Sequence, residues 1–424
     1  MVSRRHFIGS VGAGISSASL AWSALPAKTP RKRMAIITNV YLMQRHGQHM
    51  GDRFLTGYPL NGTWNDPQLD VVSMYVDQKP QGDLSAQRAQ EFGLTVYPSV
   101  AETLRCGGDK LAVDAVLVIG EHGEYPLSKW GQKKYPRYEY FKQIVDVFKK
   151  DGRTVPVFND KHLSWKWEWA NEMVTTAQQM NFPLMAGSSL PVTWRMPAVD
   201  MPFNAEVDEV MSLAYGGIDS YDFHALEVLQ CMAERRRGGE TGVATVQALQ
   251  GDAVWRALEK GSFQAGGFSR ELFKACLCRT QTLGQTHAGF GDRYPTVKEI
   301  RQLVPTPTMY RIQYNDGLKA TMLLMNGLVK DFTFAAKLKQ QPEPLSTLFY
   351  LPPQPNVQYS AILMAQAEQM FLTGKSVYPV ERTLLTSGVL ATAVQSLTNN
   401  FQVITTPQLN VKYTVHAESL FCRT

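Results

Sequence analysis

The sequence predicts an α/β fold in which a doubly wound parallel sheet is followed by an α+β domain with an open, mostly antiparallel sheet. The first half alternates short apolar runs with amphipathic ones, the pattern of buried parallel strands joined by helices. From about Met201 the candidate strands are longer and alternate in polarity, with a turn signal at 315–317. At 424 residues and 44% hydrophobic composition, the chain can bury two cores.

The individual elements follow from these patterns. Six apolar runs are expected as parallel strands, at 34–40, 71–76, 94–97, 113–119, 155–158 and 183–186. Helices are expected between them, for example at 85–92 and 138–149, joined to the strands by right-handed crossovers. The second half is expected to contain strands at 309–314, 318–325 and 330–337 and a closing helix at 383–397.

The N-terminus has the pattern of a twin-arginine export signal over residues 1–27. Arg4 and Arg5 precede an uncharged, mildly apolar stretch that is too rich in glycine and serine for a stable buried helix. Cleavage is expected between Ala24 and Lys28, which would place the mature chain in the periplasm or another extracytoplasmic compartment. Beyond this signal no apolar run approaches the ~20 residues that a membrane span needs.

The charge of the mature chain does not favour nucleic acid as a partner. Removal of residues 1–27 takes away two arginines and no acid, so 41 basic residues remain against 37 acidic ones. The densest basic run, at 235–237, is interpreted as a solvated helix end. Five widely spaced cysteines, an odd number, do not predict a disulfide framework.

The segment from Val155 to His162 carries the strongest chemical signal. An apolar strand stops abruptly at Asp160-Lys161-His162. In an open α/β sheet, ligands bind outside the carboxyl ends of the strands, so these side chains lie where a substrate would arrive. The alternative is a capped loop in which Asp160 or Ser164 begins the following helix.

This octet resembles the strand and Glu-Lys-Pro turn of the glucose-fructose oxidoreductase and inositol dehydrogenase family, with the proline replaced. A second segment, from Gly216 to Glu227, is similar to the family's aspartate-x-x-x-histidine segment, and His224 and Glu227 match it. The resemblance covers nearly the whole mature chain. It implies a Rossmann-like nucleotide-binding domain over 32–190 and a domain for substrate binding and oligomerisation over 191–424.

The resemblance also implies an oxidoreductase that transfers a hydride between a sugar or polyol and a nicotinamide cofactor, NAD or NADP. Lys161 would orient the substrate hydroxyl and lower its pKa, and His224 would accept its proton, with Asp160 beside them. His162, Arg195 and Asp222 are expected to face the substrate, Arg195 by contact with an anionic group.

The first strand departs from the family, because the turn over 38–51 lacks G-x-G-x-x-G. The bulky residues at 40–42 are expected to crowd a phosphate, although Arg45 could contact one through its side chain. Asp77 ends the second strand, where an acid binds a ribose hydroxyl. The residues expected around the cofactor are Thr38, Asn39, Arg45, His46, Asp77, Glu121 and His122.

Two other functions remain open. In one, His122, Asp160, His162 and His224 hold a divalent metal, for which such mixed ligands suit zinc or manganese, and the protein is a hydrolase, lyase or isomerase of a carbohydrate. In the other, the chain is a periplasmic binding protein that keeps the fold without the reaction. A homo-oligomer is also expected, because an open sheet often pairs face to face with another subunit.

Overall fold

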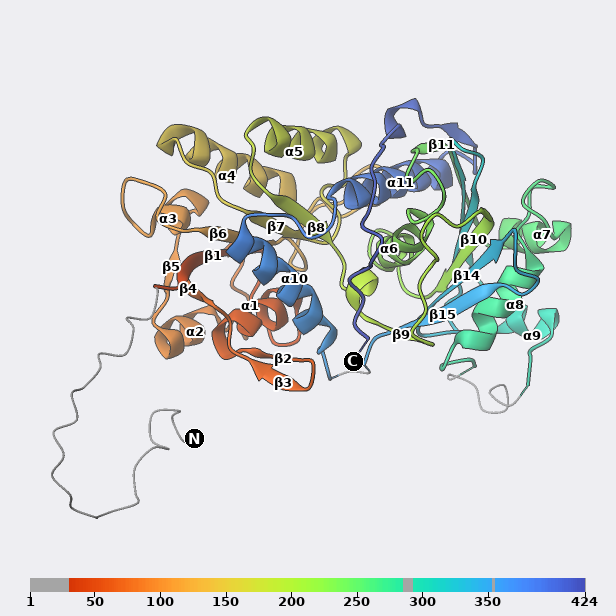
Figure 1. The fold of residues 1–424 in the computed structure, drawn as a ribbon, viewed down its shortest axis with the longest axis horizontal. Coiled ribbons are helices and arrows are strands. Elements are labelled where there is room, and N and C mark those ends of the chain that lie inside the picture. Colours follow the sequence, from red (N-terminus) through yellow and green to blue (C-terminus); the bar gives the residue numbers. More distant parts are fainter. Residues whose placement is uncertain (1–29, 285–292, 353–354, 424) are drawn as a thin grey trace, which may run out of the picture. The chain divides into compact units, whose positions relative to one another are not determined.

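The computed structural model describes residues 30–284, 293–352 and 355–423. The predicted export signal over 1–27 therefore lies outside the described residues. The first sheet has six strands, all parallel, in the order β5-β4-β1-β6-β7-β8 (Figure 1). Their bounds are β5 (Thr95–Tyr97), β4 (Leu69–Val76), β1 (Lys32–Thr38), β6 (Ala115–Ile119), β7 (Val157–Asp160) and β8 (Leu184–Gly187). This confirms the predicted doubly wound parallel sheet.

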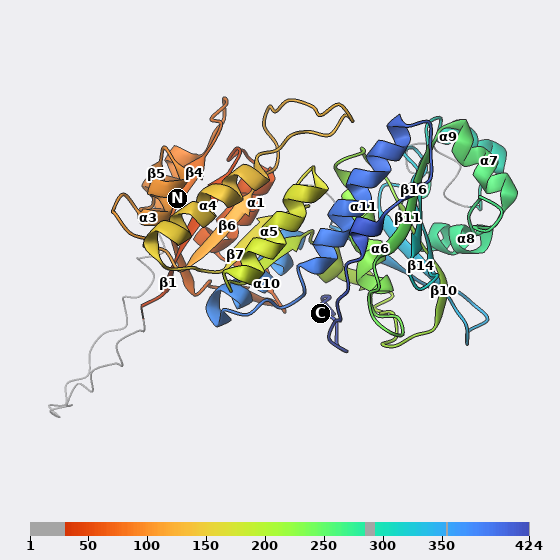
Figure 2. The ribbon, with the colours of Figure 1, turned by 90° about the horizontal axis from the view of Figure 1, so that it is seen from above.

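Helices cover both faces of this sheet, which is why its strands are apolar on both sides. One face packs against α3 (Val100–Arg105), α4 (Arg137–Asp151) and α5 (Trp167–Gln179), and Figure 2 shows α4 and α5 lying along the strands. The other face packs against α1 (His46–Thr56), α2 (Ser85–Phe92) and α10 (Tyr359–Thr373). The helices predicted at 85–92 and 138–149 are α2 and α4.

Helix α10 comes from late in the chain but belongs to the first sheet. Phe371 of α10 is fully buried, and its ring lies 6.2 Å from that of Phe54 in α1. The ammonium group of Lys32 in β1 donates hydrogen bonds to the carbonyls of Phe371 and Leu372, at 3.0 and 2.8 Å. A small hairpin of β2 (Tyr58–Leu60) and β3 (Thr63–Asn65) adjoins α10. The boundary predicted near residue 190 stays a prediction.

The second sheet has eight strands and is antiparallel except between β10 and β13. In spatial order they are β16 (Ile404–Thr405), β11 (Val243–Gln250), β12 (Thr308–Tyr314), β13 (Lys319–Leu324), β10 (Val207–Ala214), β14 (Phe332–Leu338), β15 (Leu345–Tyr350) and β9 (Trp194–Met196). The predicted hairpin is confirmed as β12 and β13. The sheet is mostly antiparallel and its edge strands do not join, as the sequence predicts.

Both faces of the second sheet are also covered. One face packs against α6 (Tyr221–Ala233) and α11 (Glu381–Thr398), and the other against α7 (Asp252–Lys260), α8 (Arg270–Arg279) and α9 (Val297–Leu303). The sequence pattern does not predict that α7, α8 and α9 cover the second face. The face expected to pair with another subunit is thus occupied by the chain itself. Short 3₁₀ helices lie at η1 (Leu190–Val192) and η2 (Pro407–Leu409).

Two local findings complete the fold. The basic run at 235–237 is not a solvated helix end, because Arg235 and Arg236 are buried, at 5% and 3% exposure, and only Arg237 is exposed. Arg235 donates to the carbonyl of Met201, and Arg236 pairs with Glu240. Within the described ranges, no helix combines the length and apolarity needed to cross a bilayer.

Candidate functional site

The carboxyl ends of β6 and β7, together with the starts of three helices, bring nine charged and imidazole side chains together. His46 and His49 lie in the first turn of α1, Arg137 begins α4, and His224 lies in the first turn of α6. Many of these residues are buried, and close ring contacts connect His46 to His49 and His122, at 5.0 and 5.2 Å between ring centroids. We call this the histidine cluster: His46, His49, Glu121, His122, Arg137, Asp160, Lys161, His162 and His224.

Lys161 and His224 form the centre of the cluster. The ammonium Nζ of Lys161 lies 2.6 Å from Nε2 of His224. Burial and the charge of Lys161 hold the pKa of His224 well below its usual value, so the imidazole is neutral and Nε2 accepts the hydrogen bond. The proton then resides on Nδ1. The N–H group at Nδ1 of His224 is therefore a buried donor without a partner among the described residues.

The backbone holds Lys161 in an uncommon conformation. Its φ of 69° lies in the left-handed region, which non-glycine residues rarely adopt. Its N–H donates to the carbonyl of Gly187 at the end of β8. A Cβ at Gly187 would lie 2.8 Å from a carboxylate oxygen of Glu227, so glycine permits this close approach. The turn fixes the direction of the lysine at the edge of the sheet.

Asp160 is the buried carboxylate of the cluster. Burial raises its pKa to about 6, although Lys161 and Arg137 act in the opposite direction. Its Oδ2 lies 2.6 Å from Nδ1 of His46, whose own pKa is lowered by burial and by Lys161. Its Oδ1 has no partner among the described residues. Asp160 can thus change protonation state near neutral pH.

Arg137 was not predicted and is the largest fully buried side chain. It contacts Glu121 through one terminal nitrogen and donates to Nε2 of His162 through the other, at 3.0 Å. Burial alone would raise the pKa of Glu121, but the charges of Lys161 and Arg137 outweigh it and lower the pKa. Room for Arg137 comes from Gly120, where a Cβ would lie 2.5 Å from the arginine side chain. A single arginine after a proline gave no sequence signal for this role.

The predicted cofactor residues lie around the ends of β1, β4 and β6. Thr38 donates its hydroxyl proton to the carbonyls of Val40 and Ile119 and so shapes the turn. Asn39 donates to the carbonyl of His122 at 3.1 Å. Asp77 is exposed, and its two oxygens accept from tyrosine hydroxyls, at 2.8 and 2.6 Å. Arg45 is exposed at the N-cap of α1.

These residues fit a dinucleotide better than the sequence suggested. Val40 and Tyr41 are buried, at 1% and 0% exposure, so these two side chains do not crowd the surface of the turn, whereas Leu42 is half-buried and the expectation for it stays a prediction. At Gly47 a Cβ would lie 2.3 Å from the carbonyl oxygen of Val40, so one glycine gives the close packing of helix and turn. Helix α1 has no acid in its first turn, which leaves its N-terminus suited to an anion.

Two residues predicted to face the substrate have other partners. Asp222 accepts hydrogen bonds from the backbone N–H groups of residues 219, 220 and 223 and from the hydroxyl of Tyr310. Arg195 pairs with Asp200 at 2.5 Å and lines a different cavity. These structural contacts replace the predicted substrate contacts. His162, the third, lies within the cluster, bonded to Arg137.

The predicted metal site does not form. No three His, Cys, Asp or Glu side chains within the described part of the chain are arranged to hold a metal ion. The reason is visible in the contacts, because His224 is bonded to Lys161 and His162 is bonded to Arg137. The four-ligand set of His122, Asp160, His162 and His224 is therefore wrong.

No protein-family model and no curated protein matches the chain. Several solved structures match the chain. GenD2 from gentamicin A biosynthesis, in complex with NAD, is 12% identical over 94% of this chain and 99% of its own, with a TM-score of 0.53. A probable dehydrogenase from Thermotoga maritima is 12% identical over 89% and 99%, with a TM-score of 0.51. Myo-inositol dehydrogenase from Lactobacillus casei, in complex with NAD(H) and myo-inositol, is 12% identical over 88% and 96%, with a TM-score of 0.50. The chain therefore has the fold of the inositol dehydrogenases, as its sequence motifs predict.

Proposed function

We propose that this protein is an NAD- or NADP-dependent oxidoreductase that removes a hydride from a hydroxyl-bearing carbon of a sugar or polyol. The observation that carries the proposal is the hydrogen bond of 2.6 Å between Lys161 and His224 at the carboxyl end of β7. Two structures of the same fold, GenD2 in complex with NAD and a dehydrogenase in complex with NAD(H) and myo-inositol, support the cofactor and the substrate class.

The roles of the residues follow from their protonation states. Lys161 donates a hydrogen bond to the substrate hydroxyl and stabilises the developing alkoxide. His224 is neutral because burial and Lys161 lower its pKa, so its Nε2 can accept the hydroxyl proton at neutral pH once the substrate oxygen replaces Lys161 as the partner of that nitrogen. Asp160, with a pKa of about 6, precedes Lys161 in the turn and is bonded to His46. Its negative charge would balance the positive charge that forms on His224.

The cofactor would be held at the ends of β1 and β4. Arg45 and the first turn of α1 would contact the phosphates, and Asp77 would accept from a ribose hydroxyl. When bound, the nicotinamide supplies the hydride acceptor. The exposed positions of Arg45 and Asp77 support this assignment, since neither has to be uncovered for a nucleotide to reach it.

We also propose that the protein is exported by the twin-arginine route with its cofactor already bound. The pattern at residues 1–27 supports this. Replacement of Arg4 and Arg5 by lysine should retain the protein in the cytoplasm of fractionated cells. Unchanged recovery from the periplasm would overturn the export proposal and leave the enzymatic one untouched.

The function is tested by supplying NAD or NADP with myo-inositol, scyllo-inositol and a panel of sugars, and by recording the absorbance of the reduced nicotinamide. Lys161→Ala and His224→Ala should each lower kcat by about 10²–10⁴-fold, the range expected for loss of a general acid or base. Lys149→Ala, on the exposed side of α4, is the matched control and should retain full activity. Tight substrate binding without any nucleotide-dependent oxidation would instead indicate a binding protein.

A further inference from the structure

A second cavity lies away from the histidine cluster. Its volume is about 400 Å³, within the range of small-molecule sites. It is bounded by η1, by the C-terminal half of α6, by the segment 377–382 and by the C-terminal segment 415–420. Its walls are largely apolar, with Val192, Val377 and Leu420 among the lining residues. The histidine cluster contributes nothing to its lining.

Three lining residues carry a buried polar atom that has no partner among the described residues. These atoms are Nε of Arg195 and the hydroxyl oxygens of Tyr378 and Ser419. Arg195 and Tyr378 are only 5% and 6% exposed. A buried donor without a partner costs about 1–3 kcal/mol, so three around one cavity need an explanation. Burial raises the pKa of Tyr378, which keeps its hydroxyl protonated and able to donate.

The charges around the cavity favour an anion. Three guanidinium groups line it, those of Arg195, Arg235 and Arg382. The carboxylates that form ion pairs with them are two, Asp200 for the first two and Glu234 for Arg382. Glu227 also lies near Arg382, but burial raises its pKa to about 7, so its negative charge is only partial at neutral pH. One positive charge is therefore in excess among these groups. Glu418 also lines the cavity, but it is exposed, where solvent screens its charge.

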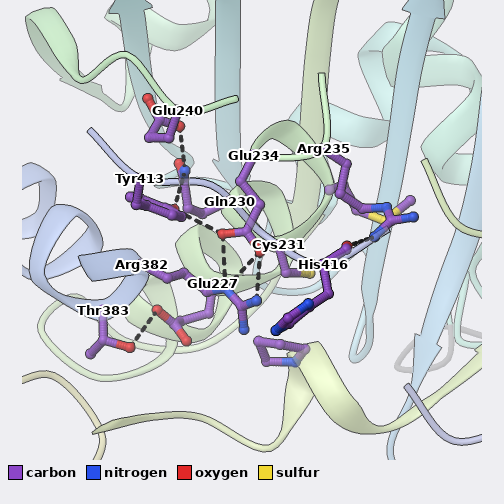
Figure 3. Close-up of polar contacts among 12 residues, drawn as sticks. Glu227, Gln230, Cys231, Glu234, Arg235, Glu240, Arg382, Thr383, Tyr413 and His416 are labelled. Carbon is purple, nitrogen blue, oxygen red and sulfur yellow. Dashed lines mark hydrogen bonds and ion pairs between the residues drawn. The ribbon is translucent and has the colours of Figure 1, made fainter. Parts of the chain in front are cut away.

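The C-terminal segment holds this arrangement in place. Arg235 donates to the carbonyls of His416 and Ala417, at 3.2 and 2.7 Å. Figure 3 shows Arg235 reaching His416, with Cys231 and Arg382 close by. Arg195 lies between the rings of Phe349 and Phe421, 4.8 and 4.2 Å from their centroids. These contacts hold Arg195 and Arg235 against the wall of the cavity.

We propose that this cavity binds a small organic monocarboxylate with an apolar body. These three donors are buried in the wall of the cavity, so small rotations of their side chains would bring them to the carboxylate, which would accept hydrogen bonds from Nε of Arg195 and from the hydroxyls of Tyr378 and Ser419. The single excess positive charge matches a monoanion, and the apolar walls match an aliphatic chain. The site involves none of the residues of the proposed oxidoreductase reaction, so either proposal can fail without the other.

The experiment titrates hexanoate, and separately its uncharged amide hexanamide, into the full chain by isothermal titration calorimetry. Hexanoate should bind saturably at one site per chain, and hexanamide at least tenfold more weakly. Tyr378→Phe and Ser419→Ala should each weaken hexanoate binding by about 10–100-fold, as expected for one lost hydrogen bond to a charged group. Because these hydroxyls have no protein partner, the thermal midpoint of the ligand-free variants should not fall.

Ser212→Ala is the matched control. It also removes a buried hydroxyl without a partner among the described residues, but from β10, outside the cavity, and should leave hexanoate binding unchanged. The proposal is overturned if hexanoate shows no saturable binding, or if Tyr378→Phe and Ser419→Ala bind it as tightly as the natural chain. Tighter binding of inorganic phosphate than of hexanoate would overturn the assignment to a monocarboxylate.

Discussion

Helix α6 carries two buried polar clusters with opposite character. Its N-terminal turn contributes His224 to the histidine cluster, and the rest of the helix contributes to what we call the α6 network: Glu227, Gln230, Glu234, Arg236, Glu240, Arg382 and Tyr413. Within the described residues, no buried polar side-chain atom of the network lacks a hydrogen bond, whereas six such atoms of the histidine cluster do. Polar groups that serve the fold are mostly satisfied by the fold, so a concentration of unsatisfied ones in one place indicates a ligand site.

Backbone conformation separates the two clusters in the same way. Lys161 and His122 have φ values of 69° and 64°, in the left-handed region, and no member of the α6 network has a positive φ. Strained residues of this kind persist when the surrounding structure enforces them, and they gather at functional sites. Four substitutions test this contrast.

The largest effect is expected from breaking the α6 network. Arg382→Ala removes the guanidinium that donates to both oxygens of Glu234, and leaves that carboxylate buried and short of a partner. The free energy of unfolding should fall by about 3–5 kcal/mol, measured by urea denaturation. The matched control is Arg301→Ala, which breaks an exposed pair with Glu259 and should cost less than about 1 kcal/mol. Equal losses would contradict the contrast between buried and exposed pairs.

In the histidine cluster, replacing the buried carboxylate of Asp160 should stabilise the protein. The folded-state pKa of Asp160 is raised to about 6, so the folded protein binds this proton more tightly than the unfolded chain and loses stability as pH rises from about 4 to 6. Asp160→Asn removes this loss of stability, because the amide does not ionise. The variant should gain stability relative to the natural chain across that window, reaching about 2–3 kcal/mol by pH 7. A difference in stability that does not vary with pH would show that Asp160 titrates normally.

A smaller effect is expected at Asp222, in the first turn of α6, two residues before His224. Asp222→Asn should lower the free energy of unfolding by about 1–2 kcal/mol, because the amide cannot replace all of the backbone and tyrosine contacts. The KM for the polyol should be unchanged. A raised KM with unchanged stability would restore the substrate role that the sequence predicts.

The smallest effect isolates backbone strain. Lys161→Gly and Lys161→Ala both remove the amine and should lower kcat to the same extent, by about 10²–10⁴-fold. Glycine alone relieves the left-handed conformation, so Lys161→Gly should be more stable than Lys161→Ala by about 0.5–1 kcal/mol in urea denaturation. Equal stability of the two variants would show that the turn stores no strain.

The sequence predicts well whatever depends on local pattern. Strands buried on both faces form continuous apolar runs, and their carboxyl ends meet at one edge, so Asp160, Lys161 and Glu121 could be placed near one another. Arg137 and Gly120 could not, because their roles depend on a contact between two elements that neither segment signals alone. The covering of the second sheet by α7 to α9 was missed for the same reason. The predicted roles of Arg195 and Asp222 failed because their partners come from tertiary packing.

The packing of α10 against the first sheet affects when the N-terminal half can fold during synthesis. Helices α1 and α2 cover part of the second face early, but the ribosome has to synthesise residue 373 before α10 can complete the covering, and the bonds of Lys32 to the end of α10 span 339 and 340 residues. Until then, the nascent N-terminal half presents an apolar surface to the cytosol. The two halves therefore cannot fold one after the other, and a chain that is cut short before α10 yields an aggregation-prone fragment and a substrate for chaperones instead of a working nucleotide-binding unit.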